Sequence, residues 1–192
     1  MTPLSLTDFI LETIKTPRDA AKRLLGYNIS ADLAFLAMGA MIGAYVLLIM
    51  ALSGLQPVAL MPGMAPMGPL YLAVVLFGGN VLLIVAVSIC GRPFGGQGTV
   101  TQAVLLFAWL QAIQMLFQIA QLIVALVSNV IAAFLGLGVL ILVIWILLNF
   151  IDALHNLNSL GKSALVFLLA IVGIAVGLTL ITTLLGISPP TA

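Results

Sequence analysis

The sequence predicts an all-α, polytopic membrane protein with five transmembrane helices, preceded by an amphipathic N-terminal segment at the membrane interface. Of its 192 residues, 64% are hydrophobic and 6% are charged, and the mean hydropathy is +1.35. Soluble domains carry about 25% charged residues, so this chain has too few polar side chains to cover a water-facing surface. Most of its surface must therefore contact the lipid bilayer. The net charge of +1 leaves no basic face for nucleic acid.

Residues 1–31 are predicted to form a cytosolic or interfacial segment. A cleavable signal peptide would place its apolar core here, but residues 8–23 carry seven charges. At about 100° per residue, the apolar side chains of residues 6–14 share one helix face, as in helices that lie in a membrane interface. A second short helix is predicted after Thr16 as cap and Pro17 at the first helical position. Its basic residues would meet anionic headgroups, and the segment would either fix topology or bind a partner.

Residues 32–187 contain five apolar stretches of the roughly 20 residues that a membrane span requires. These predicted spans cover residues 33–54, 69–91, 100–127, 130–151 and 163–186, and leave 188–192 as a short tail. Proline and glycine interrupt the chain between the first two spans and again at residues 91–99. Residues 100–151 carry no charge and no proline, and they are too long for one crossing. We therefore expect a tight helical hairpin at Ser128 and Asn129.

The distribution of positive charge predicts the orientation. With five spans and the N-terminus in the cytoplasm, every lysine and arginine falls on the cytoplasmic side. These residues are Lys15, Arg18, Lys22, Arg23, Arg92 and Lys162. The sequence therefore predicts a cytoplasmic N-terminus and an external C-terminus.

Four glutamines in the third predicted span form a one-sided polar stripe. Gln111, Gln114, Gln118 and Gln121 are spaced by three, four and three residues, which places them within an arc of roughly 80°. An unpaired amide in hydrocarbon costs several kcal/mol, so the stripe must face away from lipid. Interhelical hydrogen bonding is the first hypothesis, with Asn129, Asn149, Asn156 and Asn158 as candidate partners. A polar cavity or permeation path and an oligomer interface are the alternatives.

Asp152, His155 and Lys162 are predicted to form a polar cluster at the cytoplasmic end of the fourth span. Asp152 and His155 are three residues apart and share a helix face. A zinc site needs three or four ligands, and no further histidine or nearby acid is present. We therefore interpret the cluster as a helix-end network in which Lys162 is the candidate ion partner of Asp152.

The loop after the first span contains the remaining metal-binding candidates. Met61, Met64 and Met67 offer three thioethers with a spacing that suits Cu(I). The alternative is that they serve as plain apolar surface, and no other metal and no cofactor is predicted. The single Cys90 cannot form an intramolecular disulfide.

The sequence contains two pairs of small residues at helical spacing and none of the common catalytic motifs. Gly39 with Gly43, and Gly173 with Gly177, form GxxxG pairs that permit close helix packing inside the molecule or between copies. The chain has no HExxH, paired intramembrane aspartates, P-loop or GxSxG motif. The sequence therefore predicts no catalytic residue and a protein that is not an enzyme.

Residues 88–186 resemble the Yip (Ypt-interacting protein) domain family. The similarity lies in a glycine-rich loop before the third span, Trp145 late in the fourth, and His155 followed by a Gly-Lys pair and Ala164. The N-terminal PRDAAKRLL is similar to bacterial members, which implies the bacterial inner membrane. The resemblance implies five spans and a cytosolic N-terminus. Eukaryotic members contact Rab-type GTPases through a longer N-terminal region, so a Rab-type partner is not expected here.

The leading functional hypothesis is membrane organisation or partner binding through intramembrane helix contacts. The partner would be a second copy of the chain or another membrane protein. The alternative is a small transporter or channel that uses the glutamine stripe. Transporters commonly have glycine- or proline-broken helices at the midplane, whereas the sequence has neither residue between Thr99 and Gly136.

Overall fold

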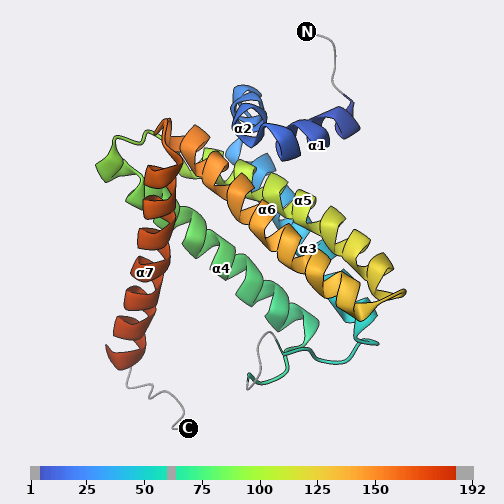
Figure 1. Ribbon diagram of the computed structural model, residues 1–192. Helices are drawn as coiled ribbons and strands as arrows, with labels where there is room; N and C mark the ends of the chain where they lie inside the picture. Colours follow the sequence, from blue (N-terminus) through green and yellow to red (C-terminus); the bar gives the residue numbers. More distant parts are fainter. Residues whose placement is uncertain (1–4, 60–63, 185–192) are drawn as a thin grey trace.

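The computed structural model describes residues 5–59 and 64–184, except for the side chains of residues 181 and 182. These residues form seven α-helices and one 3₁₀ turn, and they contain no β-strand (Figure 1). The elements are α1 (Leu6–Lys15), α2 (Pro17–Gly26), α3 (Ala31–Leu52), α4 (Pro69–Cys90), η1 (Arg92–Phe94), α5 (Val100–Ala125), α6 (Asn129–His155) and α7 (Leu160–Leu184). Helices α3 to α7 are each long and apolar enough to cross a membrane. The predicted all-α, five-span fold class is confirmed.

Serine and threonine side chains define where several helices begin. Ser5, Ser30 and Ser128 accept a hydrogen bond from a backbone N–H in the first turn of α1, α3 and α6. Thr99 starts α5 with a capping box, in which its hydroxyl and the Gln102 side chain each bond to the other's backbone. Such caps satisfy N–H groups that have no partner within the helix. Ser128 follows the end of α5 by three residues, which makes α5 and α6 the tight hairpin expected at this point.

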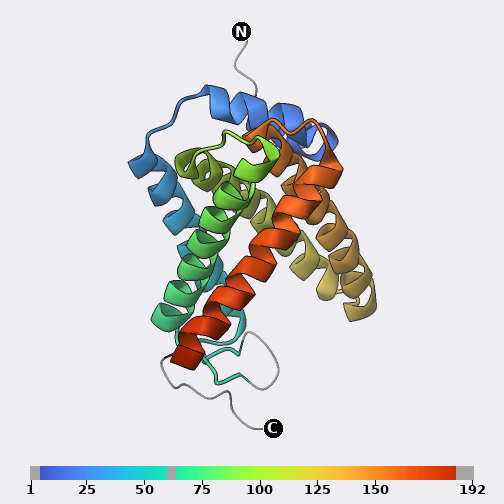
Figure 2. The same ribbon diagram turned by 90° about the vertical axis from the view of Figure 1, so that its left-hand side faces the viewer.

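The two N-terminal helices lie across one end of the bundle and are docked on it (Figures 1 and 2). The Phe9 ring of α1 packs on Trp109 of α5 with ring centroids 4.8 Å apart. The Trp109 indole Nε1 donates to the Thr13 hydroxyl at 3.0 Å. Leu6 and Leu11 of the same helix are exposed. Helix α1 therefore contacts the bundle through Phe9 and Thr13 and leaves two leucines exposed.

Helix α2 packs against α6 and α5 through small and apolar side chains. Ala20, Ala21 and Leu24 are buried there. The Thr16 hydroxyl does not cap α2, as the sequence suggested, but donates back to the Glu12 carbonyl oxygen. Docking by these apolar contacts places the charged residues of α2 beside the ends of the membrane helices.

The five long helices pack into one bundle in which α4 and α6 separate with distance from the N-terminal helices. Helix α5 packs against α3 and α6, while α7 packs against α4 and α6. Figure 2 shows α4 and α6 diverging toward the end opposite α1 and α2. The core is apolar, and its largest fully buried side chains include Phe150, Met38 and Leu106. Many leucine, isoleucine and valine side chains of the same helices are exposed and contact lipid.

Candidate intramembrane binding site

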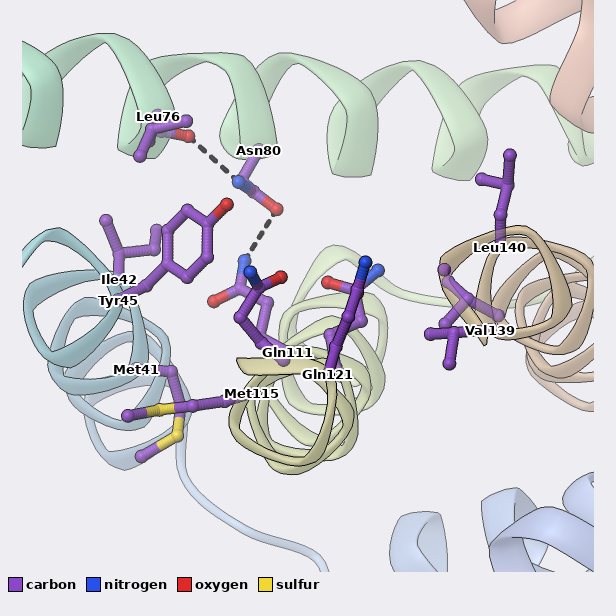
Figure 3. Close-up of a pocket in the computed structure, with 14 residues that line it drawn as sticks. Met41, Ile42, Tyr45, Leu76, Asn80, Gln111, Met115, Gln121, Val139 and Leu140 are labelled. Carbon is purple, nitrogen blue, oxygen red and sulfur yellow. Dashed lines mark hydrogen bonds between the residues drawn. The ribbon is translucent and has the colours of Figure 1, made fainter. Parts of the chain in front are cut away.

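The four glutamines of α5 all line one cavity between α3, α4, α5 and α6 (Figure 3). Its volume is about 400 Å³, and it is partly open. Tyr45 of α3 and Asn80 of α4 add polar groups, while Val139, Leu140 and Val143 of α6 form an apolar wall. The structure therefore turns the stripe toward a polar space enclosed by membrane-spanning helices.

Gln111 is the glutamine of the stripe nearest the N-terminal helices, and it joins α5 to α4. The Asn80 amide nitrogen donates to the Leu76 carbonyl oxygen at 2.9 Å, and the Gln111 amide nitrogen donates to Asn80 Oδ1 at 2.7 Å (Figure 3). Because a backbone carbonyl only accepts, the first bond sets the orientation of the Asn80 amide and, through it, that of Gln111. Gln111 Oε1 is left buried without a partner in the described residues. This pair connects two helices near the middle of the bundle.

Gln121 is the glutamine of the stripe nearest the α5–α6 turn, and it joins the two helices of the hairpin. Its amide nitrogen donates to the Ala132 carbonyl oxygen of α6 at 3.2 Å. A Cβ atom at Gly136 would lie 2.6 Å from the same nitrogen, so an alanine there would make the end of the Gln121 side chain shift. The Gln121 amide thus bridges α5 and α6 where glycine leaves room for it.

Gln114 and Gln118, between these two ends, make no hydrogen bond with any residue that the structure describes. Gln114 is exposed and Gln118 is half-buried. The Tyr45 side chain extends into the same space with its hydroxyl toward Asn80 (Figure 3). The stripe is thus divided in two: its end residues bond to neighbouring helices, and its middle residues present free amides to the cavity.

The cavity is closed toward the N-terminal helices by apolar packing. The buried residues of α5 on that side are Ala103, Val104, Leu105, Leu106, Phe107, Ala108 and Leu110. No polar side chain interrupts this series. On α5, the residues that line the cavity therefore begin at Gln111, and the part of the helix before Gln111 packs in the apolar core.

Asn80 is the polar residue of this site that the sequence reasoning missed. The four candidate partner asparagines lie elsewhere: Asn149 bonds within its own helix to the Trp145 carbonyl, for example. The available signal was a single amide in the middle of an otherwise apolar second span. Its pairing with Gln111 depends on how α4 packs against α5, which sequence spacing does not encode.

The predicted cluster of Asp152, His155 and Lys162 has a different ion pair from the one expected. Asp152 Oδ2 lies 2.8 Å from Arg18 Nε of α2, in an ion pair whose angle falls outside hydrogen-bond geometry, and Asp152 Oδ1 accepts the Ser159 backbone N–H at 3.0 Å. Arg18 also donates to the Asn158 side chain. Lys162, the predicted partner, is exposed and forms no ion pair with a described residue. The turn after α6 contains two left-handed residues, Asn156 with φ 52° and Asn158 with φ 54°, and it brings the Ser159 N–H to the carboxylate.

His155 lies on the same helix end but has separate partners. It is buried, and its Nε2 lies 3.2 Å from the Val87 carbonyl oxygen of α4. A Cβ atom at Gly91 or at Gly96 would overlap the imidazole ring. The glycine-rich loop is therefore the space into which His155 fits. No group of three or more His, Cys, Asp or Glu suited to a metal occurs among the described residues.

The methionine and small-residue candidates are not brought into a common site. Met61 lies outside the described residues, Met64 is exposed, and Met67 is buried in the core beside a β-bridge to Val58. A Cβ atom at Gly43, Gly173 or Gly177 would touch nothing. Cys90 is half-buried and free. Met67 thus serves as an apolar contact. Of the four GxxxG glycines, only Gly39 lies near another helix in the described part of the chain, where an added Cβ would be 3.9 Å from the Phe77 ring of α4.

Five apolar helices, four of which line a cavity with polar groups, and two amphipathic helices docked at one end define a polytopic α-helical membrane protein. The model of the Yip1 domain matches residues 11–181. The chain belongs to the Yip1 domain family. The match extends the resemblance seen at residues 88–186 to the N-terminal helices and the first two spans. A search of curated proteins and a search of solved structures each found no match.

Proposed function

We propose that this Yip1 domain protein is a non-enzymatic membrane-organising protein that binds a membrane-embedded partner in the amide-lined cavity. The observation that carries the proposal is the pair of unbonded amides, Gln114 and Gln118, facing a cavity within apolar helices. Amides without partners cost several kcal/mol in hydrocarbon, so an occupant that hydrogen-bonds to them would be favoured. The amide nitrogens of Gln111 and Gln121 already donate to neighbouring helices. The binding role therefore falls on Gln114 and Gln118, with Gln111 Oε1, unpaired among the described residues, as a further acceptor.

The charge distribution supports a companion proposal on location. Four of the six lysines and arginines lie on α1 or α2, Arg92 lies in η1 and Lys162 lies in the first turn of α7. With five spans, this distribution favours a cytoplasmic N-terminus and an external C-terminus. We infer a bacterial-type member in the inner membrane, with residues 1–31 as the cytosolic-side segment. Helix α1, with its exposed leucines, would lie at the lipid surface.

The test compares purified wild type with the double variant Q114L/Q118L. Both are extracted in mild detergent, and co-purifying proteins and lipids are identified by mass spectrometry. The matched control is Q56L, which makes the same exchange on the exposed Gln56 outside the cavity. We expect at least one species to be lost from the double variant and retained by the control. Identical profiles for all three folded proteins would contradict the proposal.

A permeation pathway is the alternative outcome of the same comparison. It would appear as solute flux into vesicles that is lost in Q114L/Q118L while every bound species is retained. The sealed apolar packing from Ala103 to Leu110 argues against this result. The four-glutamine replacement is less informative, because it also removes the hydrogen bonds of Gln111 and Gln121.

A further inference from the structure

The size of the cavity restricts what can occupy it. One turn of α-helix, 10–12 Å wide and 5.4 Å high, fills about 400–600 Å³. The whole cavity holds about 400 Å³, whereas a spanning helix has about five such turns. A whole spanning helix is therefore too large to lie inside it. Small-molecule pockets occupy about 300–1,000 Å³, so the volume suits a small ligand or part of a lipid.

The lining determines the charge of the occupant. The polar groups are carboxamides and one phenol, and the residues that line the cavity include no Asp, Glu, Lys, Arg or His. An ionic group placed among them would be desolvated without a counter-charge, which is costly at membrane depth. The buried part of the occupant is therefore uncharged.

The same lining calls for an occupant with one polar and one apolar side. Gln114 and Gln118 each offer two N–H donors and a carbonyl acceptor, so a group that both donates and accepts, such as a hydroxyl, satisfies them best. Across the cavity, Val139, Leu140 and Val143 present only hydrocarbon. An alcohol attached to an acyl chain matches both walls.

The depth of the stripe identifies the leaflet. Gln121 lies one turn from the end of α5 that is remote from the N-terminal helices. The ten residues back to Gln111 rise about 15 Å, which is half of a hydrocarbon core of roughly 30 Å. The polar row thus extends from one interface to about the midplane, within reach of a lipid from the leaflet opposite α1 and α2.

We propose that the cavity binds a neutral, hydroxyl-bearing glycerolipid of the diacylglycerol class from that leaflet. The glycerol hydroxyl and ester carbonyls bond to Gln114 and Gln118, and an acyl chain lies along Val139, Leu140 and Val143. This inference rests on the proposed function, since it names the chemical class of the membrane-embedded partner.

The experiment uses the full chain in phosphatidylcholine vesicles that contain a diacylglycerol with a photoreactive diazirine in one acyl chain. Photoadducts are mapped by mass spectrometry. We expect adducts on α6 between Val139 and Val143 that decrease when unlabelled diacylglycerol competes. Loss of two intramembrane hydrogen bonds of about 0.6 kcal/mol each predicts roughly five- to tenfold weaker competition in Q114L/Q118L, and no change in Q56L.

Two controls keep the result decisive if the double variant does not fold. Competition on the wild type requires no variant, and V139W fills the cavity without altering an amide, so it should abolish the adducts. A diazirine phosphatidylglycerol of the same acyl chains tests the charge argument and should label these positions at least fivefold less. Equal labelling by the two probes, or adducts confined to outward-facing residues such as Leu168, would overturn the lipid assignment.

The failure of this inference is distinguishable from the failure of the proposed function. If co-purification shows a protein lost selectively from Q114L/Q118L while the diacylglycerol probe leaves no adduct in the cavity, the lipid inference is wrong and partner binding stands. If neither experiment separates the double variant from Q56L, both proposals are wrong.

Discussion

At the scale of single residues, the His155 ring lies against Gly91 and Gly96, and this contact explains why the loop at residues 91–98 needs glycine at these two positions. Gly91 has φ −73°, a conformation open to any residue, so its requirement is space rather than backbone freedom. Gly95 is the opposite case, since its φ of 85° lies in the left-handed region that favours glycine. The loop therefore uses glycine for two different physical reasons within five residues.

We expect G91A to destabilise the protein by about 1–3 kcal/mol, because the added methyl overlaps the imidazole in a packed site. Thermal unfolding in detergent, followed by circular dichroism, measures the change. G79A is the matched control on the same helix, since a Cβ atom there meets nothing within 4 Å. In an H155A background the cost of G91A should largely disappear, because the clashing ring is gone. An equal cost in both backgrounds would show that His155 is not the cause.

At the scale of elements, the ion pair between Arg18 and Asp152 joins the N-terminal helices to the membrane bundle. The Asp152 side chain is 4% exposed and that of Arg18 is 30% exposed. Asp152 also holds the turn between α6 and α7 through Ser159. A single carboxylate thus connects three helices, α2, α6 and α7.

Replacing Arg18 by methionine should loosen α1 and α2 and lower stability. Breaking a fully buried ion pair costs 3–5 kcal/mol, and water can partly replace the half-exposed arginine, so we expect about 1–3 kcal/mol. Hydrogen exchange should increase in residues 6–26 while α5 stays protected. K162M removes a neighbouring exposed charge and should change neither quantity. If K162M has the larger effect, Lys162 rather than Arg18 stabilises the cluster.

At the scale of the whole molecule, the arrangement of charge predicts a single orientation in the membrane. Reporter cysteines in a C90A background, at Lys22 in α2 and at Gln56 in the opposite loop, test it with a membrane-impermeant maleimide. Both positions are exposed, so labelling depends on the side of the membrane. We expect Q56C to react in intact cells and K22C to react only after permeabilisation. The reverse pattern would place the N-terminus outside.

The cavity is a property of the whole bundle, because four helices from three separate parts of the chain build it. Figure 2 shows α4 diverging from α6 beside it, and the Gln111–Asn80 and Gln121–Ala132 bonds connect the helices that line it. Variants such as Q114L/Q118L alter its chemistry without removing these connections. The binding and photolabelling experiments therefore test the function of the cavity separately from the stability of the fold.

The sequence by itself determined the five-helix membrane fold, the α5–α6 hairpin and the direction of the glutamine stripe away from lipid. These features follow from hydropathy, capping residues and helical spacing. Each depends only on residues that are near one another in the sequence, so it can be read without knowing how the helices pack. It also carried the family resemblance, which the match over residues 11–181 confirms.

Only the tertiary structure decided which groups meet. Asn80 pairs with Gln111, Arg18 replaces Lys162 beside Asp152, and His155 fits against Gly91 and Gly96. Each pairing joins residues that are distant in sequence or separated by an irregular turn, so it depends on helix packing angles and on the left-handed Asn156. For the same reason, spacing alone could not reveal that two of the four glutamines bond to neighbours while the other two face the cavity.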